Sequence, residues 1–168
     1  MVRWTRLAAM LAIVIAHAGA CGYRPVARAP GPASDRLHLA APDVARIDEP
    51  ALATVLHRAL AAELGRRGVR LVGGAAVAPV LRTRALALSR GDAALGADAV
   101  SAVELSLELE CRLVDPTGKT TWHSGVIEVR EVWALSQQTL QSEHTRRVAV
   151  DRLARRAAVE IAQRLGTR

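Results

Sequence analysis

The stretch VELSLELECRL, residues 103–113, alternates strictly between apolar and polar residues. A β-strand sends successive side chains to opposite faces, so this pattern predicts a long strand with one buried face and one wet face. The polar series contains Glu104, Glu108 and Glu110. Three acids in a row suggest a cation site, but Arg112 continues the same series, which favours a solvated or ion-paired face.

A second strand is expected to return beside this one as a hairpin. Residues 115–118 (DPTG) have the composition of a tight turn, and residues 119–133 follow as the other arm. The apolar positions of that arm change parity: Trp122 is at an even position, and Ile127 at an odd one. A β-bulge at Gly125 would bring both side chains to the same face.

Two amphipathic helices flank the strands. The first is expected to begin at Pro50 and to end at Gly68, and the second covers residues 138–165. Further strands are expected at residues 36–40 and 80–88, the latter followed by a loop at 89–98. The sequence therefore predicts an α+β fold, with two helices packed on one face of a mostly antiparallel four-stranded sheet.

The first residues resemble an export signal. Residues 1–20 have a basic start, an apolar run too short to span a bilayer, and small residues before Cys21. A cysteine at this point indicates a lipoprotein signal, with Cys21 as the lipid attachment site. Ala18 stands where such signals usually have Leu, and an ordinary secretory signal with a chance cysteine is the alternative. Residues 21–35 are then a flexible tether, and residues 36–168 are the folded domain.

The charge of the chain favours an anionic partner. The formal net charge is +7, and Lys119 is the only lysine, so arginine supplies nearly all the positive charge. The planar guanidinium group binds phosphate through two hydrogen bonds, although an arginine-rich genome would produce the same preference. Nucleic acid is a poorer match for a chain with an expected export signal, and there is no Phe and only one Tyr for stacking on bases.

No pattern in the sequence indicates catalysis. There is no metal-binding HExxH or CxxC motif and no GxSxG nucleophile motif, so we expect no catalytic residues, no metal and no cofactor. Cys111 belongs to the apolar series and is expected to be a small buried side chain. The remaining candidates for contact with an anionic partner are basic residues, which ordinary surface charge would also explain. They are Arg82, Arg84, Arg90, Arg112, Lys119 and Arg130.

Several segments in order resemble the LptE family of lipopolysaccharide-assembly lipoproteins. They are CGYR at residues 21–24, LATVLHRALAAELGRRG at 52–68, VLRTRALALSRG at 80–91, LVDPTGKTTW at 113–122 and RRVAVDRLARRAAVEIAQRL at 146–165. The shortage of aromatic residues in the hairpin departs from the family pattern. The resemblance implies two helices on a four-stranded sheet, in agreement with the pattern above.

The resemblance also implies a function. Family members are non-catalytic lipoproteins of the outer membrane, facing the periplasm, that plug the LptD β-barrel, help it assemble and assist lipopolysaccharide transport to the outer leaflet. By this likeness, Arg90 and Arg130 are the first candidates for lipopolysaccharide contact. Arg82, Arg84 and Lys119 follow them as candidates from the set of basic residues above. The partners implied are an LptD-like barrel, lipopolysaccharide and the membrane. The alternatives are an adaptor for another envelope enzyme, such as a peptidoglycan synthase, and a periplasmic hydrolase.

Overall fold

The computed structural model describes residues 35–95, 100–134 and 139–166. The predicted signal peptide, Cys21 and nearly all of the tether lie outside these residues. The elements in chain order are β1 (Arg36–Leu39), α2 (Leu52–Arg66), β2 (Arg70–Leu71), β3 (Val80–Leu95), β4 (Val100–Val114), β5 (Thr120–Ala134) and α3 (Thr139–Leu165).

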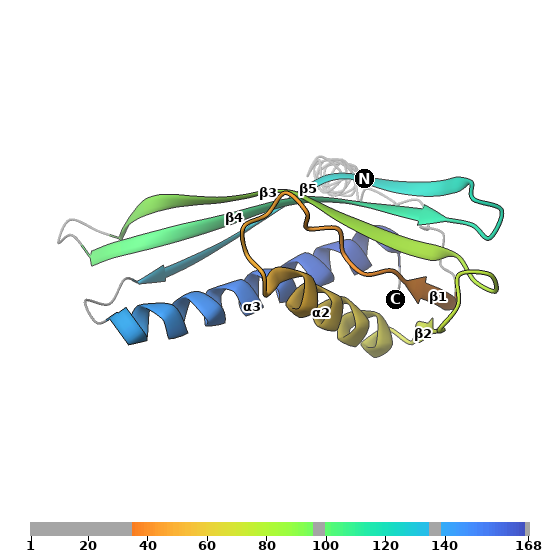
Figure 1. Cartoon of the computed structure of the whole chain (residues 1–168), viewed down its shortest axis with the longest axis horizontal. Helices are drawn as coiled ribbons and strands as arrows, with labels where there is room; N and C mark the ends of the chain where they lie inside the picture. The colour runs from red at the N-terminus through yellow and green to blue at the C-terminus, as the bar shows by residue number, and fades with distance from the viewer. Residues whose placement is uncertain (1–34, 96–99, 135–138, 167–168) are drawn as a thin grey trace, which may run out of the picture.

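The strands form one mixed sheet in the order β2-β1-β3-β4-β5. β1 pairs in parallel with both β2 and β3, whereas β3, β4 and β5 are antiparallel. Figure 1 shows the long strands as one layer, with α2 and α3 together on one side of it. The predicted α+β class is confirmed, but the count of four strands is wrong. The fifth strand is β2, which has two residues and is too short to leave a periodic signal.

β3 is longer than the sequence predicted. Pairing with β4 continues to Leu95 opposite Val100, through the segment expected to be a loop. A register shift between Ala85 and Ala87 also reverses the face of the sheet on which the later side chains of β3 lie. In an unbroken strand Leu88 would share a face with Arg82, but the shift turns Leu88 to the face that the helices cover, where it packs against the core.

The bulge predicted at Gly125 is confirmed. The register of β4 and β5 shifts between Glu110 and Arg112, so that Ser124 and Gly125 lie opposite Cys111 alone. Gly125 has a φ of +67°, which favours glycine, and the Cys111 amide donates to Ser124 Oγ at 2.8 Å. The bulge restores the parity, so Trp122 and Ile127 both contact the core.

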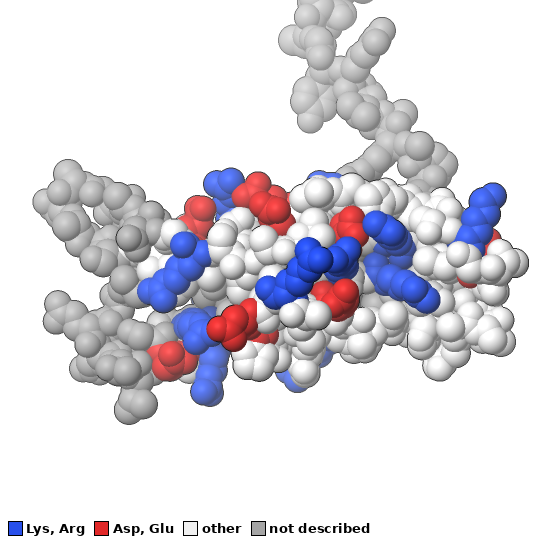
Figure 2. Space-filling model, turned by 45° about the horizontal axis from the view of Figure 1, so that its top comes forward, with Lys and Arg blue, Asp and Glu red and all other residues white. Residues whose placement is uncertain are grey.

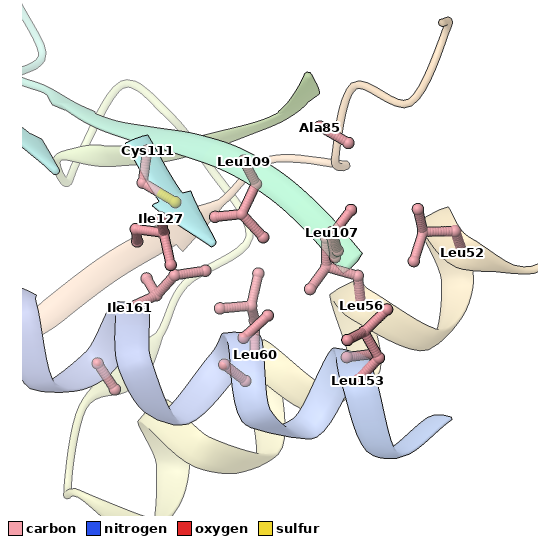
Figure 3. Packing of buried hydrophobic residues seen from close by; sticks show 14 of the residues in the cluster. Leu52, Leu56, Leu60, Ala85, Leu107, Leu109, Cys111, Ile127, Leu153 and Ile161 are labelled. Atoms are coloured by element: carbon pink, nitrogen blue, oxygen red, sulfur yellow. The ribbon is translucent and has the colours of Figure 1, made fainter. Parts of the chain in front are cut away.

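The core lies between the sheet and the two helices. Figure 3 shows leucines of α2 and α3 meeting apolar side chains from β4 and β5. The fully buried set includes Leu52, Leu56, Leu60, Leu107, Leu109, Cys111, Ile127, Leu153 and Ile161. Burying a side chain of this size contributes about 1.5–3 kcal/mol relative to leaving it in water. The strict alternation in β4 therefore holds the sheet against both helices.

The end of α2 is a Schellman motif, in which the last turn of a helix is closed by a residue with positive φ. Gly68 has a φ of +79°, the Val69 amide donates to the Leu64 carbonyl at 3.0 Å, and the Gly68 amide donates to the Gly65 carbonyl at 3.0 Å. Val69 and Leu64 are both buried. The motif thus sets the direction in which the chain leaves α2 and enters β2.

Two alanine substitutions three residues apart should have opposite effects on stability. Gly68→Ala should lower the free energy of unfolding by roughly 1–2 kcal/mol, because an L side chain is strained at positive φ. Gly65→Ala is the matched control: this glycine lies inside α2, and an added Cβ would meet no atom within 4 Å. It should raise stability by about 0.5–1 kcal/mol. Chemical denaturation measures both, and a shift in the same direction for both variants would contradict the motif.

Candidate functional site

The face of the sheet opposite the helices, which we call the open face, carries polar and charged side chains. In Figure 2 this face is tilted toward the viewer, and Lys or Arg and Asp or Glu mingle across it. The predicted wet face of β4 lies here. The charged members on β3, β4 and β5 are Arg82, Arg84, Glu104, Glu108, Glu110, Arg112, His123, Glu128 and Arg130.

Arg130, one of the first candidates, is held by carboxylates of the open face. Its guanidinium lies 2.7 Å from Glu128 and 3.6 Å from Glu104. The hydrogen bond from Arg130, followed by one from Ser106, lowers the pKa of Glu128, and the same carboxylate raises the pKa of Arg130. The charge of Arg130 is therefore largely balanced within the protein.

Arg90 lies on the other side of the sheet. It is opposite Leu105, a core-facing residue, and its guanidinium carbon is 5.9 Å from the centre of the Trp133 ring. This is the geometry of a cation–π contact. The two first candidates for lipopolysaccharide contact, Arg90 and Arg130, are thus on opposite faces of the sheet.

Lys119 lies at the tip of the β4–β5 hairpin. The Asp115 carboxylate accepts hydrogen bonds from the Thr117 hydroxyl at 2.6 Å and from the Thr117 and Lys119 amides at 2.9 Å. These bonds, the hydroxyl first, lower the pKa of Asp115. The Lys119 backbone therefore helps to fix the turn.

Arg82 and Arg84 do come together, at the β1 side of the open face. With Arg112 of β4 they line a hollow of about 490 Å³, which we call the arginine hollow. Its other polar lining residues are His38, Asp43, Thr83 and Glu110. The lining holds three arginines and two carboxylates, so one positive charge is in excess when His38 is neutral.

The charged groups of the arginine hollow are unevenly paired. Arg112 lies 3.1 Å from Glu110, and Arg84 lies 3.8 Å from Asp43. His38 and Asp43 were not predicted as site residues, and Glu110 was expected only as part of a solvated or ion-paired face. In β1, His38 alternates with two buried leucines, and this alternation in the sequence could have indicated that His38 faces away from the core. Asp43 could not be found from the sequence, because it meets Arg84 where an isolated β-bridge joins two distant segments.

The free edge of β5 is covered by arginines from α3. Arg156 donates to the Arg130 carbonyl at 2.8 Å, and Arg164 donates to the Ser124 carbonyl at 3.0 Å. Arg156 also lies 3.1 Å from the buried carboxylate of Glu131. These bonds fasten α3 to the last strand and occupy carbonyl groups that an edge strand would otherwise offer to another chain.

Cys111 is buried, as predicted, with no exposed surface. Its sulfur lies 3.5 Å from the Thr83 hydroxyl, and burial raises the pKa of the thiol to about 12. Among residues 35–95, 100–134 and 139–166, no three His, Cys, Asp or Glu side chains are grouped so as to hold a metal ion. No helix in the same part of the chain is long and apolar enough to cross a membrane.

Comparison with known proteins places the fold in a family. The model of the LptE family, described as lipopolysaccharide-assembly, matches residues 35–165. No curated protein matches the sequence.

Solved structures from several bacteria have a similar fold. A protein from Caulobacter crescentus described as a lipoprotein is 18% identical, with a TM-score of 0.56, over 78% of this chain and 88% of its own. A Helicobacter pylori protein described as a homolog of the neuraminyllactose-binding hemagglutinin is 16% identical, with a TM-score of 0.51, over 82% and 88%. The rare lipoprotein B of Shewanella oneidensis is 23% identical, with a TM-score of 0.49, over 76% and 91%.

The Cys111 thiol should not react in the folded protein. Thiol reagents attack the thiolate, which a buried group with a pKa of about 12 scarcely forms at pH 8. In a Cys21→Ser variant, where Cys111 is the only thiol, a colorimetric disulfide reagent should give no signal until denaturant is added, and then one thiol per chain. Rapid labelling without denaturant would show that the sheet opens near Cys111.

Proposed function

The chain belongs to the LptE family of lipopolysaccharide-assembly proteins, and on this premise we propose that it is an outer-membrane lipoprotein that plugs an LptD-like β-barrel. In this proposal it faces the periplasm, helps the barrel to assemble, assists lipopolysaccharide transport to the outer leaflet, and catalyses no reaction. The observation that carries the proposal is the extent of the family match. It runs from Asp35, one residue before β1, to Leu165, the last residue of α3.

The open face suits a place inside a barrel. The lumen of a wide outer-membrane barrel is polar, and a plug needs a rigid body with a polar surface. The open face supplies charged side chains that are held by one another, as in the contacts of Arg130 with Glu104 and Glu128. Such a surface would meet a polar wall with charged groups that are already ion-paired.

The basic residues support contact with lipopolysaccharide. Lipopolysaccharide offers phosphate groups, which arginine binds through its planar fork. Of the predicted contacts, Arg82 and Arg84 line a hollow with an excess of positive charge, whereas Arg130 is balanced by two carboxylates. We therefore rank Arg82 and Arg84 ahead of Arg130, Arg90 and Lys119.

The membrane anchor in this proposal is Cys21. Acylation there would hold the protein at the inner leaflet, because several acyl chains bind a membrane firmly where one binds marginally. Residues 22–35 would then join the anchor to β1. This tether is rich in proline, which favours an extended chain.

The proposal predicts a stoichiometric complex that depends on the anchor. A tagged chain expressed in its own host and extracted in mild detergent should co-purify with a very large β-barrel protein, identified by mass spectrometry. Cys21→Ala should remove the chain from the membrane fraction and strongly reduce the recovered barrel. Cys111→Ala makes the same change at the buried cysteine and should leave the complex intact.

Other outcomes of this purification would contradict the proposal. Recovery of peptidoglycan enzymes without a barrel would favour the adaptor function. Recovery of no membrane partner would leave only the family assignment.

A further inference from the structure

Two arginines face each other across neighbouring strands in the arginine hollow. Arg82 of β3 is in direct register with Arg112 of β4, and both side chains are on the open face. Like charges directly opposite each other destabilise an antiparallel pair. Such an arrangement is tolerated when another group in the site offsets the repulsion between the two charges.

The protein supplies only part of that compensation. Glu110 lies 3.1 Å from Arg112, but its second oxygen lies 3.2 Å from His123. Asp43 is 3.8 Å from Arg84, on the outer limit of an ion pair. Within the part of the chain that the structure describes, Arg82 has neither an ion pair nor a hydrogen bond from its side chain. Its charge is the one left in excess.

A like-charged pair of the opposite sign also lies on the open face. Glu108 lies opposite Glu128, also in direct register. Here the protein itself supplies the counter-charge, because Arg130 binds Glu128 at 2.7 Å and the Ser106 hydroxyl donates to it at 3.0 Å. The arginine pair has the same pattern, since Arg112 has Glu110 while Arg82 has no side-chain partner among the described residues. Glu108 has none there either, but of these two residues it is Arg82 that lines the arginine hollow, where a ligand could supply the missing counter-charge.

The shape of the hollow admits such a partner. Small side chains form part of its wall, from Ala40, Ala41 and Ala75, so that a ligand can approach the guanidinium groups between them. A volume of about 490 Å³ exceeds that of a single ion and suits a charged group attached to a larger molecule.

We propose that the arginine hollow binds a phosphoryl group, with Arg82 and Arg112 donating hydrogen bonds to its oxygens from adjacent strands. A phosphate monoester carries up to two negative charges and three acceptor oxygens, so it can accept from two guanidinium forks at once. A carboxylate has one charge and two oxygens, and the hollow already contains two of these groups. The assignment of this phosphoryl group to lipopolysaccharide rests on the proposed function. The proposal that the arginine hollow binds a phosphoryl group does not depend on it.

Thermal unfolding of the full-length acylated chain in detergent tests the site. Inorganic phosphate should raise the unfolding midpoint above that in chloride at the same ionic strength. Arg82→Gln should begin with a higher midpoint in chloride, because the like-charged pair is gone, and should lose the response to phosphate. Arg155→Gln is the matched control, since it makes the same change at an exposed arginine of α3 outside the hollow, and its response to phosphate should remain.

Binding to lipopolysaccharide and to lipopolysaccharide stripped of its phosphates identifies the source of the phosphoryl group. If the group belongs to the lipid, Arg82→Gln should weaken binding of the intact form about tenfold, the loss expected for a charge-assisted hydrogen bond, and removal of the phosphates should do the same. If inorganic phosphate alone shows the Arg82 dependence, the site takes a small free anion. Either result supports the site.

The site is overturned if the wild type responds to neither inorganic phosphate nor lipopolysaccharide. It is also overturned if Arg82→Gln behaves as the wild type, or if Arg155→Gln loses as much binding. The barrel purification separates this failure from that of the proposed function. A barrel that still co-purifies while the phosphate response is absent would leave the plug proposal standing.

Discussion

Burial of one face of β4 is the constraint on which the rest of this structure depends. β4 lies between β3 and β5, and its residues from Val103 to Leu113 present every second side chain to the helices. Covering those side chains requires both α2 and α3, which pack against each other as well as against the sheet. Because the alternation has a period of two, the same burial sends the glutamates and Arg112 to the open face. The chemistry of that face is therefore a by-product of core packing.

Two irregularities decide which charges share a face. The register shift at Ala85 and Ala87 leaves Arg82 and Arg84 on the open face but puts Arg90 on the other. The bulge at Gly125 has the converse effect in β5: it puts His123, before the bulge, and Arg130, after it, on the same open face although their sequence parity differs. A strand without these shifts would reverse every side chain beyond them. The β3 residues of the arginine hollow all lie before the shift, in the first register of the strand.

Much of the fold could be predicted from short-range patterns. The β4–β5 hairpin, the bulge at Gly125, the glycine at the end of α2 and the burial of Cys111 all follow from a few neighbouring residues. The end of β3 could not, because Gly91 and Asp92 are typical of a loop and their strand geometry comes only from pairing with β4.

The candidate site shows the same limit. Arg82 and Arg84 were found as basic residues, but the opposition of Arg82 and Arg112 depends on the register of two strands. The loss of free charge at Arg130 likewise depends on neighbours from another strand. The burial of Glu131 under arginines of α3 has no local signal at all.

The arginine bonds at the edge of β5 have a consequence for how the protein behaves at high concentration. Two copies meeting edge to edge would each have to release guanidinium groups from strand carbonyls before any new ladder could form, and would bring like charges together as they did so. The barrier to self-association is thus built from hydrogen bonds and repulsion, and not from a loop that blocks access. Since salt screens the repulsion and weakens exposed ion contacts, the colloidal stability of this protein is tied to ionic strength.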